Sequence, residues 1–160
     1  MSPITGTGTV ASLHLHPAQP GKPLRAVHSI EAVAEQGIVD NGRYFGRLSR
    51  STGQPSKRQV TLMEREQIAE HATALGLETI SPGVVRSNIE TTGLDLIALI
   101  GQEVRVGEAI LFFYEARTPC EKMDRICQGL RAQMDERRQG VLAQVVRGGV
   151  IRVGDAITGL

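Results

Sequence analysis

Alternating apolar and polar residues near the start of the chain predict that its first regular element is a β-strand. Residues 11–16 alternate in the way expected of a strand with one buried face. Pro17, Pro20 and Pro23 then interrupt the pattern, so we expect the strand to end there. Residues 24–33 are rich in small and β-branched residues and predict a second strand.

The spacing of apolar residues changes in two regions, and there it predicts helices. Apolar residues recur at helical spacing over residues 68–75, directly after a short strand predicted over residues 59–63. Thr61 and Glu64 have the spacing of a capping box, which predicts a defined junction between this strand and the helix. A second, amphipathic helix is predicted to begin near Cys120. Its apolar face would consist of Met123, Ile126, Cys127, Leu130 and Met134.

Several further segments predict strands. Residues 84–89 follow a Pro-Gly turn and would place the side chains of Arg86 and Asn88 on the same face of a strand. Residues 104–106 and 109–116 predict two consecutive strands, of which the second is apolar enough to be central.

The end of the chain predicts a β-hairpin. Residues 141–147 and 150–157 read as strands, and Gly148-Gly149 between them is a typical hairpin signal. Many short strands with glycine corners and only two helices predict a mainly β fold of the α+β kind. We expect a closed or nearly closed β-barrel with a few peripheral helices.

Composition narrows the class of protein. A length of 160 residues with 41% hydrophobic and 22% charged residues is typical of one globular domain. Aromatic residues make up 3%, Trp is absent and the net charge is +1, which argues against nucleic-acid binding. No apolar run approaches the roughly 18 residues of a membrane-spanning helix, and residues 1–9 lack the features of a signal peptide. These features predict a cytoplasmic protein that does not contact membranes and has reduced cysteines.

The strongest chemical signal is Cys120. Thr118, Pro119 and Glu121 are favoured residues for the N-cap, N1 and N3 positions of a helix, which would place Cys120 at N2. The helix dipole stabilises a thiolate there, and Arg117 would do the same if it turned toward the sulfur, whereas Glu121 opposes ionisation. The alternative is a small buried cysteine without chemistry. Packing is the better interpretation for Cys127, which lies on the apolar face.

A basic loop follows the second predicted strand. Between residues 41 and 63 no acidic residue occurs. Five positive charges occur there: Arg43, Arg47, Arg50, Lys57 and Arg58. This loop could bind a phosphate-bearing cofactor or a nucleic-acid backbone, or be a solvated surface loop. His14 and His16 share the polar face of the first strand, and because no acidic or thiol partner is near in sequence, we expect them at the surface.

Several segments in a fixed order resemble the MOSC family, which is named after the C-terminal domain of molybdenum cofactor sulfurases. The segments are Gly37–Asp40, Arg58–Leu62, Pro82–Ile89, Gly93–Leu96, Gly101–Ala109 and Arg117–Cys120. The resemblance extends from about Val10 to Ile157 and implies a single MOSC-like domain over residues 1–160, folded as a β-barrel. The chain departs from the family pattern Gly-[Ile/Leu]-x-Gly-Asp, because Asp40-Asn41 stands where Gly-Asp is usual.

The resemblance also implies functional residues. Cys120 matches the cysteine proposed in the family to carry sulfur as a persulfide or to ligate molybdenum. Arg86 and Asn88 match polar positions that line the cofactor pocket in related proteins, and Arg58 and Gln59 belong to a further family motif. The pyridoxal-phosphate sulfurase domain of the larger enzymes is not expected, so sulfur would come from a donor protein or pass to a molybdenum-cofactor enzyme.

Three functions follow as hypotheses. The first is a protein that binds molybdenum cofactor (molybdopterin) or carries sulfur on Cys120. The anionic end of the cofactor would be held by Arg86, Asn88, Arg58, Arg43 and Arg117. The second is a molybdenum-dependent reductase of N-hydroxylated bases or related compounds. The third is a module that binds an anion or a nucleic acid through the basic loop, without the thiol.

Overall fold

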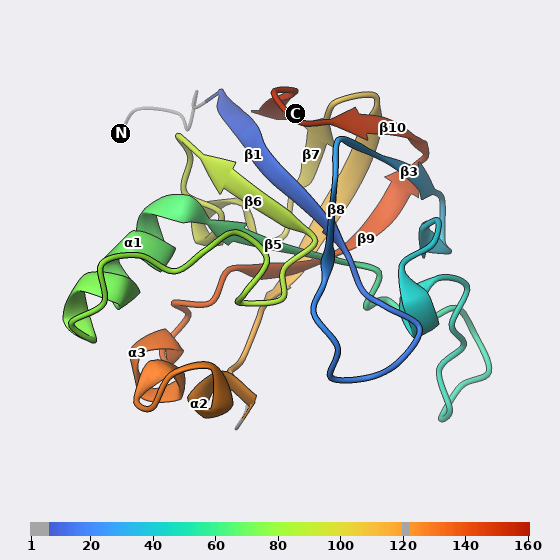
Figure 1. Cartoon of the computed structure of the whole chain (residues 1–160). Coiled ribbons are helices and arrows are strands. Elements are labelled where there is room, and N and C mark those ends of the chain that lie inside the picture. The colour runs from blue at the N-terminus through green and yellow to red at the C-terminus, as the bar shows by residue number, and fades with distance from the viewer. Residues whose placement is uncertain (1–6, 120–121) are drawn as a thin grey trace.

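Seven strands close into a barrel in the computed structural model, which describes residues 7–119 and 122–160 (Figure 1). Around the barrel the order is β11, β7, β8, β9, β5, β6 and β1, and β1 pairs back with β11. The strands β5 and β6 run parallel, and the other neighbours run antiparallel. Their bounds are β1 Gly8–Leu15, β5 Val60–Glu64, β6 Ile89–Thr92, β7 Glu103–Val106, β8 Ala109–Ala116, β9 Val141–Arg147 and β11 Ala156–Gly159. The predicted barrel is confirmed.

A small second sheet lies beside the barrel. Its strands are β10 (Gly149–Arg152), β3 (Ser29–Val33) and β4 (Gly37–Ile38), while β2 (Arg25–Val27) extends the pairing of β1. The predicted hairpin around Gly148-Gly149 is therefore wrong, because β10 pairs with β3 and not with β9. A Cβ atom at Gly148 would lie 2.7 Å from the carbonyl oxygen of Ala32. Glycine is used here for close backbone approach between two sheets.

The barrel interior is filled by aliphatic side chains and one phenylalanine. β8 lies between β7 and β9, as expected for a central strand, and its Leu111 and Phe113 are completely buried. The same cluster includes Leu13, Leu62, Ile89, Val104, Val145 and Ile157. These contacts come from strands far apart in the chain, so the core fixes the positions at which the loops leave the barrel.

Three short helices cover a second apolar cluster on one side of the barrel (Figure 1). They are α1 (Arg65–Ala74), α2 (Lys122–Ile126) and α3 (Leu130–Met134). Cys127 packs against this cluster, as the sequence predicted. The predicted second helix is interrupted, because Gly129 adopts a left-handed conformation with φ 91° between α2 and α3. No helix in the described part of the chain is long and apolar enough to cross a membrane.

The junction between β5 and α1 differs from the predicted capping box. The N-cap of α1 is Glu64, and no side chain caps the helix by a hydrogen bond. Thr61 lies inside β5, where its hydroxyl accepts a hydrogen bond from the backbone N–H of Asn88 at 2.9 Å. The threonine therefore links two parallel strands at the end of the barrel that carries the candidate site, and it has no role in the helix start.

Candidate functional site

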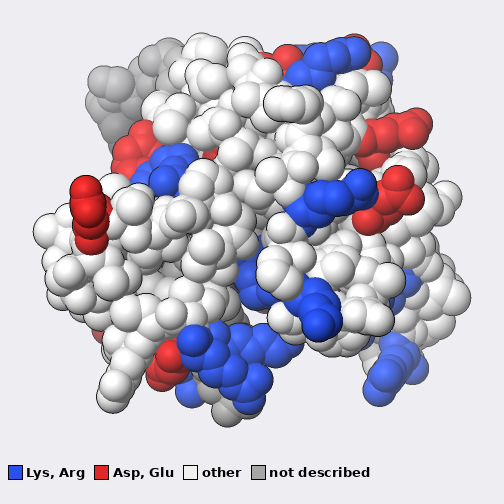
Figure 2. Space-filling view, viewed as in Figure 1, with Lys and Arg blue, Asp and Glu red and all other residues white. Residues whose placement is uncertain are grey.

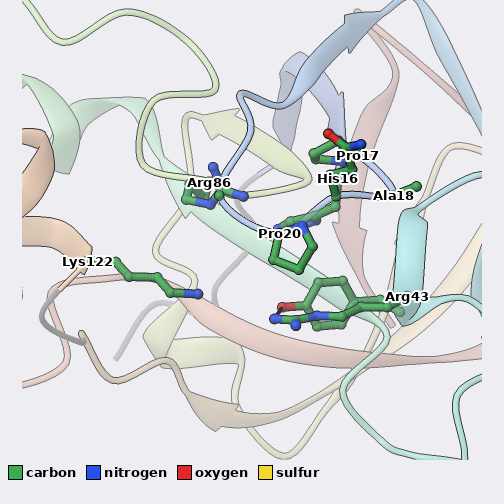
Figure 3. A pocket seen from close by; sticks show the side chains of 10 residues that line it. His16, Pro17, Ala18, Pro20, Arg43, Arg86 and Lys122 are labelled. Atoms are coloured by element: carbon green, nitrogen blue, oxygen red, sulfur yellow. Dashed lines mark hydrogen bonds between the residues drawn. The ribbon is translucent and has the colours of Figure 1, made fainter.

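A basic pocket lies where the loop after β1, the short 3-10 helix Gly42–Tyr44, the turn before β6 and the start of α2 meet. Its volume is about 30 Å³. Figure 3 shows the charged ends of Arg43, Arg86 and Lys122 directed into the same space, although they come from three separate segments. A smaller adjoining cavity adds Arg58 and shares His16 with the pocket.

A wider cleft continues from the pocket. Its volume is about 380 Å³, and it shares Arg86 and Lys122 with the pocket. Val84 and Ile126 add apolar surface, and Arg125 adds charge. The small basic pocket thus opens into a larger cleft that is partly apolar.

The charge of the site is positive. No Asp or Glu of the described residues lines the pocket, its adjoining cavity or the cleft. Figure 2 shows Lys and Arg side chains gathered along the lower part of this face, where α2 and the loop after β1 lie in Figure 1. Like charges that converge without a carboxylate repel one another, so an anion in the pocket would relieve this repulsion.

Arg86 lies in a turn, and the prediction of a strand over residues 84–89 is wrong. Its φ is 65°, and its backbone N–H donates a hydrogen bond to the carbonyl of Gly83. The side chain donates to the carbonyl oxygen of Lys22 at 3.0 Å, which ties the turn to the loop after β1. The turn, and not a shared strand face, brings Arg86 to the pocket.

Asn88 is buried, and its side-chain amide links the segments that form the site. Its Oδ1 accepts a hydrogen bond from the backbone N–H of Thr61 at 3.1 Å. Its Nδ2 donates to the carbonyl oxygen of His14 at 3.0 Å and to Oδ1 of Asn41 at 2.9 Å. Asn88 therefore lines the cavity that adjoins the pocket, with its side-chain amide engaged by the protein.

Arg117 is also buried, and it supports the turn of Arg86. Its guanidinium donates to the hydroxyl of Ser87 at 2.8 Å and to the carbonyl oxygens of Val85 and Arg86 at 3.2 and 3.4 Å. Only 7% of Arg117 is exposed, so its charge acts on the pocket through the protein interior. These contacts make Arg117 a positioning residue for the turn.

Aromatic rings connect the basic loop to the pocket. The rings of His16 and Tyr44 lie with centroids 4.7 Å apart. The guanidinium carbons of Arg43 and Arg58 lie 5.3 and 5.6 Å from the Tyr44 ring centre. Burial raises the pKa of Tyr44, but the hydrogen bond from Arg43 and the charges of Arg58 and Arg43 outweigh burial and lower that pKa. The other basic residues of the loop, Arg47, Arg50 and Lys57, do not line this pocket.

His14 and His16 are not surface residues, which corrects the sequence prediction. His14 is 1% exposed, and its Nδ1 lies 3.0 Å from the carbonyl oxygen of Ser87. His16 is half-buried and lines the pocket. The pKa of His16 is lowered to about 4: burial is the largest cause, the hydrogen bond to Asn41 acts in the opposite direction, and the charges of Arg86, Arg117 and Arg58 contribute to the lowering.

The loop in which Asp40-Asn41 replaces the usual Gly-Asp of the family keeps a backbone conformation typical of glycine. Asp40 has a φ of 65°, in the left-handed region where glycine is usual and where Asp is tolerated better than most residues. Asp40 is exposed, whereas Asn41 is buried and accepts a hydrogen bond from the backbone N–H of His16 at 2.8 Å. The residue that contributes to the site is therefore Asn41.

Cys120, together with Glu121, lies outside the described residues, so the predicted helix start over Thr118–Glu121 stays a prediction. The next described residue, Lys122, lines the basic pocket. Within residues 7–119 and 122–160, no three His, Cys, Asp or Glu side chains are grouped closely enough to hold a metal ion.

A family model for the MOSC domain matches residues 25–158. The chain belongs to the MOSC domain family. The match includes Arg43, Arg58, Arg86, Asn88 and Arg117. His16 precedes the matched region.

Solved structures share the fold of this MOSC domain. The YuaD protein of Bacillus subtilis is 18% identical with a TM-score of 0.76, and the alignment covers 94% of both chains. YiiM of Escherichia coli is 19% identical with a TM-score of 0.68, covering 99% of this chain and 70% of that one. YiiM of Geobacillus stearothermophilus is 16% identical with a TM-score of 0.71, covering 96% and 75%. At these identities the likeness shows the fold alone. A comparison with curated proteins found no match.

Proposed function

We propose that this MOSC protein binds molybdenum cofactor by the cofactor's anionic end and uses Cys120 as the sulfur atom next to it. The observation that carries the proposal is the convergence of Arg43, Arg86 and Lys122 on one space without a carboxylate among the described lining residues. Arginine is suited to phosphate because its planar guanidinium donates two parallel hydrogen bonds.

The arrangement of a basic pocket beside a partly apolar cleft suits a ligand with a small charged end and a larger organic part. The pocket of about 30 Å³ would take the phosphate, held by Arg43, Arg86 and Lys122 with Arg58 beside it. The adjoining cleft of about 380 Å³ would take the organic part, against the apolar surface of Val84 and Ile126. When bound, the cofactor supplies a metal centre able to exchange electrons and oxygen or sulfur ligands.

Cys120 would contribute the thiolate. It is two positions before Lys122, which lines the pocket, and three positions after Arg117, which supports the turn of Arg86. A thiolate in the first turn of a helix and close to basic groups is a ligand for a metal and an acceptor of sulfane sulfur. In the second role it would receive sulfur from a donor protein or pass it to a molybdenum enzyme.

Loading of the protein with isolated molybdenum cofactor under anaerobic conditions tests this proposal. We expect about one molybdenum per chain for the wild type and for Arg105→Ala, whose arginine is exposed on β7 away from the pocket. Arg86→Ala should lose at least about tenfold in affinity, because a charge-assisted hydrogen bond contributes about 1.5–3 kcal/mol. Equal loading of Arg86→Ala and Arg105→Ala would exclude this pocket as the binding site.

A further inference from the structure

The orientation of the Asn41 side chain is determined by its neighbours. The backbone N–H of His16 donates to Oδ1 of Asn41 at 2.8 Å, and a backbone N–H can only donate. Nδ2 of Asn88 donates to the same oxygen at 2.9 Å. Asn88 is itself oriented, because its Oδ1 accepts from the backbone N–H of Thr61. Asn41 therefore presents an oxygen, and not an amide N–H, toward His16.

This oxygen determines the tautomer of His16. The Nδ1 atom of His16 lies 3.1 Å from Oδ1 of Asn41, and two acceptors cannot share a hydrogen bond without a proton. Nδ2 of Asn88 also lies 3.5 Å from Nδ1, but its two hydrogens are donated at shorter distances to the carbonyl oxygen of His14 and to Oδ1 of Asn41. Nδ1 therefore carries the hydrogen, and Nε2 of the neutral ring carries a lone pair. Among the described residues Nε2 has no hydrogen-bond partner, and His16 lines both the pocket and its adjoining cavity.

The neutral form of His16 is maintained by its surroundings. Its pKa is lowered to about 4, chiefly by burial and also by the positive charges of Arg86, Arg117 and Arg58, against the opposing effect of the hydrogen bond to Asn41. Arg43, Lys122 and the Tyr44 hydroxyl are the other titratable groups that line the pocket, and none of them is a carboxylate. The imidazole is therefore an acceptor at neutral pH, in a pocket whose charged groups are all donors.

We infer that the pocket is selective for an oxyanion in which one oxygen is protonated, as in a P–OH group. Nε2 of His16 accepts the hydrogen bond from this hydroxyl. Hydrogen phosphate is the simplest such ligand. The basic residues bind its unprotonated oxygens, and His16 binds the P–OH group. Sulfate has the same shape and charge but no hydrogen, so its fourth oxygen would face a lone pair. The inference rests on the proposed function of the pocket as an anion site, and it requires the cofactor's phosphate monoester to bind as the monoanion, which keeps one hydrogen.

Titration calorimetry with inorganic phosphate and with sulfate at pH 7.5 and equal ionic strength tests the inference. We expect phosphate to bind the wild type about tenfold more tightly than sulfate, the effect of one hydrogen bond to a charged group. In His16→Phe, which keeps a ring beside Tyr44 but removes the acceptor, the two affinities should become equal. His28→Phe is the matched control, because His28 is exposed and does not line the pocket.

Asn41→Asp provides a second variant in case His16→Phe does not fold. A carboxylate beside Nδ1 favours the doubly protonated ring, which turns Nε2 into a donor, so the preference for phosphate should disappear or reverse. Methyl phosphate is mostly a dianion without a P–OH group at pH 7.5 and about half monoanion at pH 6. Its affinity relative to sulfate should therefore rise as the pH falls from 7.5 to 6, and no rise would overturn the inference.

The outcomes of these measurements separate the inference about His16 from the proposed anion site. Equal binding of phosphate and sulfate by the wild type would overturn the inference about His16 and leave the anion site intact. A preference that survives in both variants would also overturn it. Failure of both anions to bind would overturn the inference together with the proposed anion site.

Discussion

The side-chain amide of Asn88 donates a hydrogen bond of 2.9 Å to Oδ1 of Asn41, a residue 47 positions earlier in the chain. This bond joins the loop after β4 to the segment that enters β6. Both residues are 1% exposed, so the bond is shielded from water. It places His16, which bonds to the same oxygen, beside the turn that carries Arg86.

Asn88→Ala should destabilise the fold. It would leave the N–H of Thr61, the carbonyl of His14 and the Oδ1 of Asn41 without the bonds that Asn88 now makes. We expect a loss of about 3 kcal/mol in the free energy of unfolding, measured by urea denaturation. Thr73→Ala, at an exposed position of α1, serves as control and should stay within about 0.5 kcal/mol of the wild type. A change in the free energy of unfolding within about 0.5 kcal/mol for Asn88→Ala would contradict the claim that its side chain links these three segments.

Arg117 and Ser87 should be energetically coupled. The guanidinium of Arg117 donates to Ser87 Oγ at 2.8 Å in a buried setting. A double-mutant cycle of Arg117→Met and Ser87→Ala should give a coupling energy of about 1 kcal/mol or more. Additive effects of the two substitutions would show that the contact does not support the turn.

Arg117→Lys should also weaken phosphate binding, since an ammonium group cannot reproduce the fork of a guanidinium.

The stability of the protein should fall in mild acid partly because of His16. Its folded pKa of about 4 is below the unfolded value of about 6.5, so between these values the unfolded chain binds more protons. The free energy of unfolding therefore decreases as the pH falls from 6.5 toward 4, and His16 contributes no pH dependence above this window. Denaturation at several pH values should show a smaller slope for His16→Phe than for His28→Phe. Identical slopes would mean that His16 titrates normally.

Cys120 and Cys127 should differ in reactivity. If Cys120 carries sulfane sulfur, the native protein will be one sulfur atom heavier in intact mass spectrometry, and a thiol reductant will remove the difference. Cys120→Ser should abolish the extra mass. Cys127→Ser is the matched control and should retain it, because Cys127 packs against the apolar cluster beneath the helices. An extra mass that persists in Cys120→Ser would assign the chemistry elsewhere.

The sequence predicts the barrel well because alternation with a period of two is a local signal. The central position of β8 follows from its nearly continuous apolar residues, and the helix α1 follows from helical spacing, which are local signals too. Two of the errors have a common cause, which is contact with distant segments. Gly148 serves close approach to β3 and not a hairpin turn, and Thr61 bonds to Asn88 and not to a helix end.

The candidate site is predictable in part. Charge and the family resemblance identify Arg43, Arg58 and Arg86. His16 escapes detection because alternation shows which face of a strand is polar, but not that another segment covers this face. Asn88, with Thr61 and Asn41, covers the end of β1 and turns a predicted surface residue into part of a pocket. Lys122 and Tyr44 carry no local motif, since only the fold brings them to the site.

The most direct test of the central claim is the molybdenum and pterin content of the native protein, purified without oxygen from a host that makes the cofactor. We expect close to one molybdenum and one pterin per chain in the wild type. Arg86→Ala, purified in parallel, should contain little of either. A wild-type protein that contains neither molybdenum nor pterin under these conditions would contradict the account.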